Sequence, residues 1–278
     1  MRIKLLFLFL VISYASYSQD NVTIYLWPDK AQTEGSTPTV LPDRGDGVIR
    51  ITDVSKPALI VFSVPEEKNS GAAAIVCPGG AFRHLSLNKE GYEVAEWLNS
   101  IGISAFVLQY SVPDKHDQAG KDIQRAMRIV RSRADEWGIN PKKLGVIGFS
   151  AGGNLSVRVS VMPETNVYNP VDLADNVSCI PDFTMLIYSG GLGNADERAS
   201  ELSFGKSSPP MFIFCTADDK VANYGSLYLT EELYRSGIPV ELHILPDGGH
   251  GYGLRPANMA ARTWPALAET WLYRYILD

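Results

Sequence analysis

The chain alternates between short, uniformly apolar runs and longer segments in which apolar residues recur at helical spacing. The clearest apolar runs are residues 72–77, Ala-Ala-Ala-Ile-Val-Cys, and residues 144–149, Leu-Gly-Val-Ile-Gly-Phe. Runs without polar alternation are typical of parallel strands that are covered on both faces. Residues 117–137 show the other pattern, with one apolar stripe at a period near 3.6, which predicts an amphipathic helix.

These two patterns repeat to the C-terminus. Strands are predicted at 22–26, 48–52, 57–62, 72–77, 104–110, 144–149, 183–188, 211–215 and 239–245. Helices are predicted at 88–101, 117–137, 154–161, 223–236 and 261–276. This alternation predicts an α/β fold with a mostly parallel central sheet and helices on both faces. No internal repeat or linker divides residues 19–278, so we expect a single domain whose functional groups lie at the C-terminal edge of the sheet.

The first 18 residues predict a signal peptide. Two basic residues precede the apolar run 5–12, and Ser16 and Ser18 lie three and one residues before a cut at Gln19. The apolar run is too short to span a membrane, and no cysteine follows the cut, so no membrane anchor is predicted. We therefore expect export to the periplasm or the medium.

Composition excludes several classes of partner. The 278 residues are 45% hydrophobic and 20% charged, with a net charge of −6 and no basic cluster, so neither nucleic acid nor an anionic membrane is an expected partner. The three cysteines cannot all pair within the chain. Cys77 and Cys215 end apolar runs, where a small buried side chain is expected. No cysteine pair has metal-ligand spacing, and we predict neither a metal nor a cofactor.

Residues 148–153, Gly-Phe-Ser-Ala-Gly-Gly, join the apolar run 144–149 to a segment that can be helical. Gly-x-Ser-x-Gly between a strand and a helix predicts a nucleophile elbow, a sharp turn that exposes the serine hydroxyl. Gly148 and Gly152 suit this turn, because a Cβ at either position would collide with the crossing strand and helix. The turn would also aim the N–H of Ala151 at the group that Ser150 attacks.

A second glycine pair follows the strand 72–77. Two adjacent glycines let backbone N–H groups approach a ligand closely, so either Gly79 or Gly80 is predicted to donate to an oxyanion hole together with Ala151. The alternative is a tight turn without chemistry. Side chains near these loops are predicted to contact substrate: Ala81, Phe82, His84 and Tyr252.

The serine needs a base, and the chain has only four histidines. His243 lies within a predicted strand, where a packed histidine is expected, and His116 lies in a polar loop. His84 is close to the glycine pair but precedes the serine. His250 lies late in the chain, in a glycine-rich loop directly after the strand 239–245. We therefore predict His250 as the general base.

The acid should follow another strand, between the serine and the histidine. After the strand 211–215, the adjacent residues Asp218 and Asp219 compete for this role, which is to accept the imidazole N–H and stabilise the imidazolium. Asp219 can instead be a helix-start or surface residue, so the prediction is Asp218. The predicted triad is Ser150, Asp218 and His250.

With these residues in place, the chain resembles the α/β-hydrolase esterases of the acetyl xylan esterase and carbohydrate esterase type. The resemblance runs from about Val54 to the C-terminus. It is carried by five blocks in order: Cys77-Pro78-Gly79-Gly80, Asn88-Lys89-Glu90-Gly91, Asp122-Ile123-Gln124-Arg125-Ala126, Gly148-Phe149-Ser150-Ala151-Gly152-Gly153 and Gly248-Gly249-His250-Gly251.

The resemblance implies an α/β-hydrolase fold with Ser150 as nucleophile and His250 as base. Alignment of the Thr216-Ala217-Asp218 block favours Asp218 as the acid. Glu90 and Asp122 match positions of the group too, where we expect Glu90 to brace a loop and Asp122 to hydrogen bond at a helix N-terminus. Two departures lie near the expected pocket rim: Ala81 stands where a third glycine is frequent, and Ser189-Gly190-Gly191 replaces a proline-containing loop.

The function that the resemblance implies is removal of short acyl groups, acetyl first, from a plant polysaccharide such as xylan. The alternatives are a feruloyl or general short-chain carboxylesterase and, less favoured, a peptidase. A binding protein on an inactive hydrolase scaffold is the alternative from another class. Inactive relatives typically lose the serine, the acid or the histidine, whereas this chain retains a candidate for each.

Overall fold

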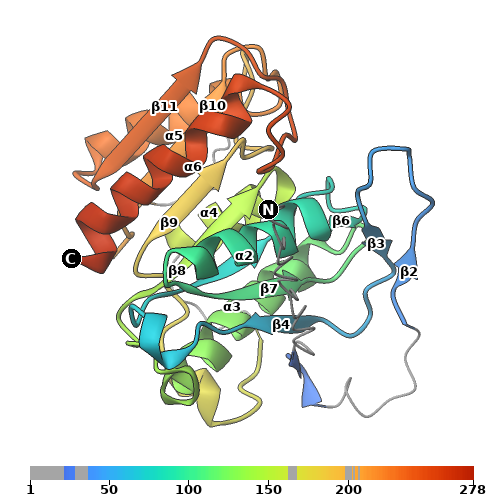
Figure 1. The fold of residues 1–278 in the computed structure, drawn as a ribbon, viewed down its shortest axis with the longest axis vertical. Helices are drawn as coiled ribbons and strands as arrows, with labels where there is room; N and C mark the ends of the chain where they lie inside the picture. The colour runs from blue at the N-terminus through green and yellow to red at the C-terminus, as the bar shows by residue number, and fades with distance from the viewer. Residues whose placement is uncertain (1–21, 29–36, 162–167, 198–201, 203, 206) are drawn as a thin grey trace, which may run out of the picture.

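The computed structural model describes residues 22–28, 37–161, 168–197, 202, 204–205 and 207–278 (Figure 1). The predicted signal peptide, residues 1–18, lies outside the described residues. Within the described part of the chain, the predicted α/β architecture is confirmed: a mostly parallel sheet carries helices on both faces.

The central sheet has eight strands in the order β1-β4-β7-β5-β8-β9-β10-β11. Their bounds are β1 Thr23–Tyr25, β4 Ala58–Phe62, β5 Ala73–Cys77, β7 Ser104–Gln109, β8 Leu144–Phe149, β9 Thr184–Ile187, β10 Met211–Thr216 and β11 Val240–Leu245. Six neighbouring strands, from β7 to β11, are parallel, and β4 and β1 are antiparallel to their neighbours. Because β5, β8, β9, β10 and β11 are consecutive in the sheet, the loops at their carboxyl ends meet along one edge.

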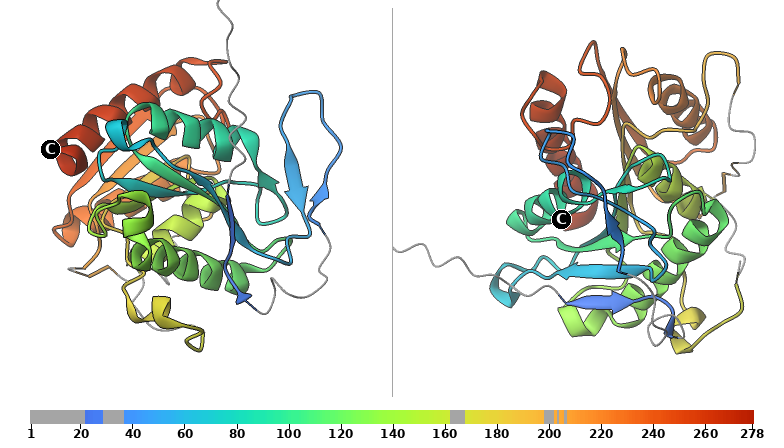
Figure 2. Two further views of the ribbon diagram at one scale, coloured as in Figure 1. Left: turned by 60° about the horizontal axis from the view of Figure 1, so that its bottom comes forward. Right: turned by 90° about the vertical axis from the view of Figure 1, so that its right-hand side faces the viewer.

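In the described part of the chain, five α-helices cover the sheet: α2 Glu93–Ser100, α3 His116–Ser132, α4 Ala151–Val161, α5 Asn223–Arg235 and α6 Met259–Leu272. Helices α2 and α6 share one face, where Trp97 and Trp264 pack edge to face with ring centroids 5.1 Å apart. Helices α3, α4 and α5 cover the other face, as the right-hand view of Figure 2 shows.

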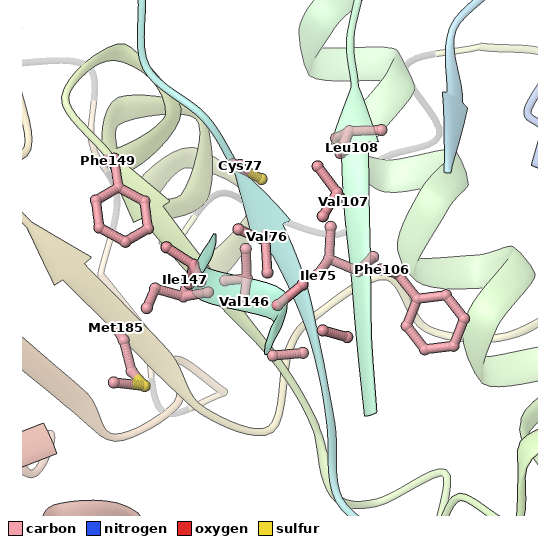
Figure 3. Close-up of a cluster of buried hydrophobic side chains, with 14 of the residues drawn as sticks. Ile75, Val76, Cys77, Phe106, Val107, Leu108, Val146, Ile147, Phe149 and Met185 are labelled. Carbon is pink, nitrogen blue, oxygen red and sulfur yellow. The ribbon is translucent and has the colours of Figure 1, made fainter. Parts of the chain in front are cut away.

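The core is built mainly from the strands at the centre of the sheet. Figure 3 shows β-branched and aromatic side chains of β5, β7 and β8 interleaved there, among them Ile75, Val107 and Val146. All five residues of β5 and all six of β8 are buried, as the uniformly apolar runs predicted. Burial on both faces fixes the positions of the two strands that lead into the glycine loops.

A second, three-stranded sheet lies beside the carboxyl-terminal edge of the central sheet. It is formed by β2 Thr39–Val40, β3 Arg50–Thr52 and β6 Leu85–Ser86. Strand β6 directly follows the Gly79-Gly80 loop, and the Ser86 N–H donates to the Gly79 carbonyl over 2.9 Å. The small sheet therefore holds this loop from its outer side.

Several helix boundaries differ from the predictions, two of them for a clear local reason. The predicted helix 117–137 ends as an α-helix at Ser132 and continues as a 3-10 turn at Ala134–Trp137, closed by Gly138 in the left-handed conformation. Helix α4 begins at Ala151 rather than at residue 154, because the elbow enters the helix directly. The glycines at 152 and 153 had concealed this first turn, since glycine disfavours helices in general.

Candidate active site

The turn after β8 is a strained elbow centred on Ser150, which adopts a left-handed φ of 51°. A Cβ at Gly148 would contact the Gly152 carbonyl and the Ser156 hydroxyl, and one at Gly152 would collide with the Cys77 carbonyl. The crossing strand and helix therefore require glycine at both positions, as the sequence pattern predicted. The serine backbone is held by β9, because its N–H donates to the Ile187 carbonyl over 3.2 Å.

Ser150, His250 and Asp219 form a continuous hydrogen-bonded series. His250 Nε2 lies 2.8 Å from Ser150 Oγ, and His250 Nδ1 lies 2.7 Å from Asp219 Oδ2. The Asp219 side chain is fully buried, whereas the imidazole is about one third exposed. The three residues follow β8, β11 and β10, which explains how groups up to 100 residues apart in the chain meet at one edge of the sheet.

The prediction that Asp218 contacts His250 is wrong. Asp218 points outward and accepts the N–H groups of Gly248 and Gly249 over 3.2 and 3.0 Å. Asp219, the next residue of the turn, points inward, and its other oxygen accepts the Val221 N–H over 2.9 Å. Asp219 thus orients the imidazole, while Asp218 shapes the loop that carries it.

The prediction for the oxyanion-hole donors also needs a correction, which concerns Gly79. The Gly79 N–H is buried and donates to Glu90 Oε2 over 2.9 Å, so it is already used. In the described part of the chain, the N–H groups of Gly80 and Ala151 donate to no protein acceptor. Gly80 has a φ of 140°, and a Cβ there would collide with the His84 carbonyl, so only glycine fits. Of the predicted oxyanion-hole donors, Gly80 and Ala151 are therefore the two whose N–H groups are not used by a protein acceptor in the described part of the chain.

Glu90 connects the Gly79 loop to the His250 loop. Its side chain is buried, and beside the bond to Gly79 it accepts the Tyr188 hydroxyl at Oε1 over 2.9 Å. The Tyr188 oxygen in turn accepts the Gly253 N–H over 2.9 Å. Burial is the main cause that raises the pKa of Tyr188, and the nearby Glu90 raises it further. The Tyr188 hydroxyl therefore stays protonated and can donate a hydrogen bond. Glu90 therefore braces a loop, as we expected, and Tyr188 is a link that no sequence pattern indicated.

Replacing Glu90 tests this brace. We expect Glu90→Leu to lower kcat by about 100-fold with little change in KM, because an oxyanion donor displaced from its position costs that order. Glu90→Gln keeps an acceptor for Gly79 and should retain most of kcat. Steady-state kinetics on an aryl acetate, with thermal unfolding of each variant, is the measurement. Equal losses in both variants, or a rise in KM alone, would contradict a positioning role.

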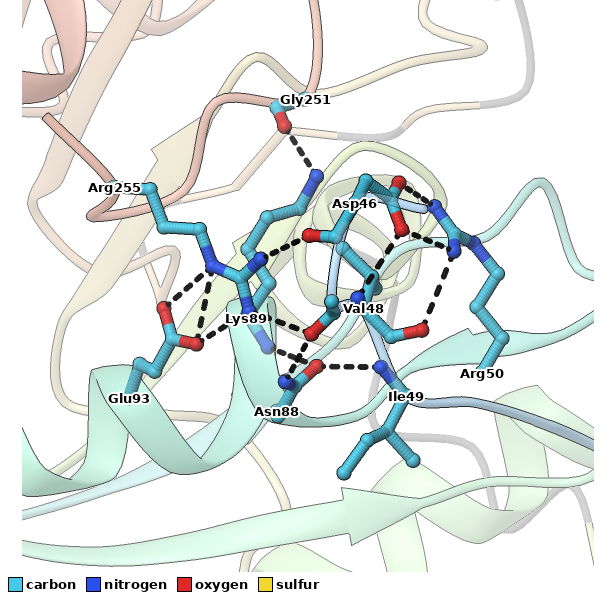
Figure 4. Close-up of polar contacts among 10 residues, drawn as sticks. Asp46, Val48, Ile49, Arg50, Asn88, Lys89, Glu93, Gly251 and Arg255 are labelled. Atoms are coloured by element: carbon cyan, nitrogen blue, oxygen red, sulfur yellow. Dashed lines mark hydrogen bonds and ion pairs between the residues drawn. The ribbon is translucent and has the colours of Figure 1, made fainter. Parts of the chain in front are cut away.

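The His250 loop is also held from the side of α2. Figure 4 shows Lys89 Nζ donating to the Gly251 carbonyl over 2.7 Å and Arg255 paired with Glu93 over 2.7 Å. Arg255 Nη1 further donates to the Asp46 carbonyl over 2.7 Å. These bonds reach the loop from segments that are distant in sequence, so the glycine-rich loop has a defined position despite its composition.

The residues predicted to contact substrate do not all lie at the surface of the site. Ala81 is exposed and, like Phe82, has a left-handed φ (55° and 56°), which explains why glycine is frequent there in the group. His84 packs behind Gly80, and burial lowers its pKa. Tyr252 is buried against Tyr188, with ring centroids 4.5 Å apart, so it supports the His250 loop rather than facing a substrate.

Of the other histidines, His243 is placed as the sequence indicated, whereas His116 is the first residue of α3 rather than part of a loop. His243 lies on β11 and pairs with Glu241 over 2.8 Å, and His116 begins α3 at an exposed position. All three cysteines are buried. Among the described residues, no group of three or more His, Cys, Asp or Glu side chains has an arrangement that would hold a metal ion. No helix in the described part of the chain is long and apolar enough to cross a bilayer.

Comparison with known proteins finds esterases and related hydrolases. The family model described as BD-FAE matches residues 61–180. An acetylxylan esterase of Xylanibacter ruminicola is 33% identical over 224 residues, which are 74% of this chain and 45% of that protein. The matched region therefore spans less than half the length of that curated relative.

Two solved structures match most of the chain. The acetyl ester-xyloside bifunctional hydrolase of Caldicellulosiruptor lactoaceticus is 32% identical, with a TM-score of 0.74 and coverage of 91% of this chain and 96% of that chain. MGS-M1, an α/β hydrolase from a deep-sea metagenome library, is 26% identical, with a TM-score of 0.65 and coverage of 88% and 100%.

The fold and these matches place the chain among the α/β hydrolases. Within this class it belongs to the α/β-hydrolase esterases of the acetyl xylan esterase and carbohydrate esterase type, the family that its sequence blocks resemble.

Proposed function

We propose that this protein is an exported esterase that removes acetyl groups from xylan or xylan-derived oligosaccharides. The observation that carries the proposal is the pair of hydrogen bonds from His250, 2.8 Å to Ser150 and 2.7 Å to Asp219. Two relatives, an acetylxylan esterase and an acetyl ester-xyloside bifunctional hydrolase, support the choice of acyl group and sugar.

In this mechanism, Ser150 Oγ attacks the ester carbonyl while His250 Nε2 takes the hydroxyl proton. The buried Asp219 accepts the Nδ1–H, fixes the tautomer and stabilises the imidazolium. The N–H groups of Gly80 and Ala151 hold the oxyanion, the second at the N-terminus of α4, where the helix dipole adds to the effect. His250 then protonates the leaving sugar hydroxyl, and water cleaves the acyl-enzyme through the same base.

Export belongs to the same proposal. Residues 1–18 have the pattern of a signal peptide, and a polysaccharide is too large to enter a cell before it is cleaved. On this proposal the enzyme acts outside the cytoplasm as the single domain formed by residues 19–278.

Acetate release tests the substrate. Residues 19–278 should release acetate from acetylated xylan, and faster than they cleave a feruloyl ester or an aryl butyrate. Comparable rates on all simple esters with no release from xylan would instead indicate a general short-chain carboxylesterase. Preference for the feruloyl ester would reassign the acyl group while leaving Ser150, His250 and Asp219 in their roles.

A further inference from the structure

A cavity of about 520 Å³ lies between the N-terminal half of α3 and the middle of α4. This volume is within the range of roughly 300–1,000 Å³ that is usual for small-molecule sites. Phe82, two residues after Gly80, lines it on the side of the oxyanion loop, and Asn154 lines it on the side of α4. The mechanism proposed above uses none of the lining side chains.

The cavity begins one helical turn from the nucleophile. The Asn154 N–H donates to the Ser150 carbonyl over 3.1 Å, and a rise of about 1.5 Å per residue places Asn154 roughly 6 Å along α4 from Ser150. The Asn154 amide also donates to the carbonyls of Gly190 and Gly191 over 3.3 and 3.1 Å. A ligand whose ester lies at Ser150 can therefore extend into this space.

The lining contains a buried acceptor that needs a partner. Gln124 lies on α3 with 8% of its surface exposed, and its Oε1 has no hydrogen-bond partner in the described part of the chain. A buried amide oxygen without a partner is unfavourable, so native structures generally supply one. Gln124 lines the cavity, but its Oε1 is buried, so a bound hydroxyl group reaches this oxygen only after the side chain turns toward the cavity.

The remaining lining groups combine an aromatic wall with charged side chains. The rings of Phe82 and His116 lie together, with centroids 4.2 Å apart. Asp117 and Lys121 bring opposite charges, and Arg158 donates from Nε to Asn154 over 2.8 Å. Sugar rings carry apolar C–H faces and hydroxyl edges, which match such a mixture, whereas an acyl tail would leave the polar groups unpaired.

We propose that this cavity is a subsite for a sugar unit of the carbohydrate that bears the ester, adjacent to the unit held at Ser150. The inference rests on the proposed function and deepens it. The occupant is a pentose or hexose of a xylan-like chain, packed on Phe82 and hydrogen-bonded to Gln124. The subsite would raise the affinity for oligosaccharides without contributing to cleavage of a small ester.

Gly120 offers a way to fill the cavity. It lies inside α3, lines the cavity, and a Cβ added there meets nothing within 4 Å. Its φ lies outside the left-handed range, so a larger residue brings no backbone strain, and a helical Gly→Ala change generally stabilises. Gly120→Phe therefore blocks the cavity, Gly120→Ala is the matched control, and thermal unfolding of each confirms the fold.

The kinetic test compares acetylated xylotriose with 4-nitrophenyl acetate. We expect Gly120→Phe to lower kcat/KM on the acetylated trisaccharide at least tenfold, through KM, while both variants keep aryl acetate turnover within about twofold of wild type. Gln124→Leu, which removes the unpaired amide, should raise the same KM. Equal losses on both substrates, no loss on either, or a loss confined to long-chain aryl esters would overturn the subsite.

A binding measurement distinguishes failure of the subsite from failure of the proposed function. If the wild type cleaves the aryl acetate but releases no acetate from any saccharide, the proposed function fails. Calorimetry with unacetylated xylotriose then decides the cavity alone. Binding to the wild type and not to Gly120→Phe supports the subsite, and absent or equal binding overturns it.

Discussion

Ser150→Ala should lower kcat on both acetylated xylan and an aryl acetate by about 10⁴- to 10⁶-fold, the loss expected when the nucleophile of a serine hydrolase is removed. The change deletes one oxygen that lies 2.8 Å from His250 Nε2. No other described bond of the elbow depends on this hydroxyl, because the turn is held through its backbone, from Ser150 N–H to Ile187 and from Gly190 N–H to the Ser150 carbonyl. The thermal midpoint should therefore stay close to that of the wild type.

The matched control is Ser100→Ala, at an exposed position near the end of α2, where the hydroxyl bonds only to the Trp97 carbonyl. It should keep full activity. Acetate release and labelling by a fluorophosphonate probe are the two measurements, and the probe should label the wild type and Ser100→Ala but not Ser150→Ala. A folded Ser150→Ala protein that still turns over substrate would remove the proposed mechanism.

The fold was predictable because its central strands are buried on both faces. Uniformly apolar runs such as residues 73–77 and 144–149 appear in the sequence without polar interruption, and the structure buries every one of these residues. Helix periodicity located α3 for the same reason, since one stripe faces the sheet. The boundaries were less predictable, because local turns such as that at Gly138 depend on contacts across the fold.

The residues of the site were predictable where the site requires a particular backbone conformation. Gly148, Gly152 and Gly80 are glycines because a Cβ would collide with a crossing segment, and this requirement is visible in the sequence as a motif. The position of His250 followed from the small number of histidines and from its loop. These constraints act on residue type, which is what a sequence records.

The predictions that were wrong depend on the direction in which a side chain points, which a sequence does not record. Asp218 and Asp219 are chemically identical, and the turn after β10 sends one toward Gly248 and Gly249 and the other toward His250. The Asp219–Val221 bond was a usable signal, since an aspartate commonly accepts the N–H two residues later in a turn. The use of the Gly79 N–H by Glu90 requires a contact across 11 residues and a buried carboxylate, which no local pattern shows.

Asp219 and Asp218 provide a matched pair of variants for the second prediction with a large expected effect on kcat. Asp219→Asn should lower kcat by about 10³- to 10⁴-fold, because an amide at this position no longer holds the imidazole in the tautomer that accepts the serine proton. Asp218→Asn should lower it less than about tenfold, since only bonds that shape the loop at Gly248 and Gly249 are weakened. Steady-state rates on an aryl acetate, compared at equal thermal stability, distinguish the two. If Asp218→Asn proved the more damaging change, the outward-facing carboxylate would be the partner of His250 during turnover, and the loop would have to rearrange on binding substrate.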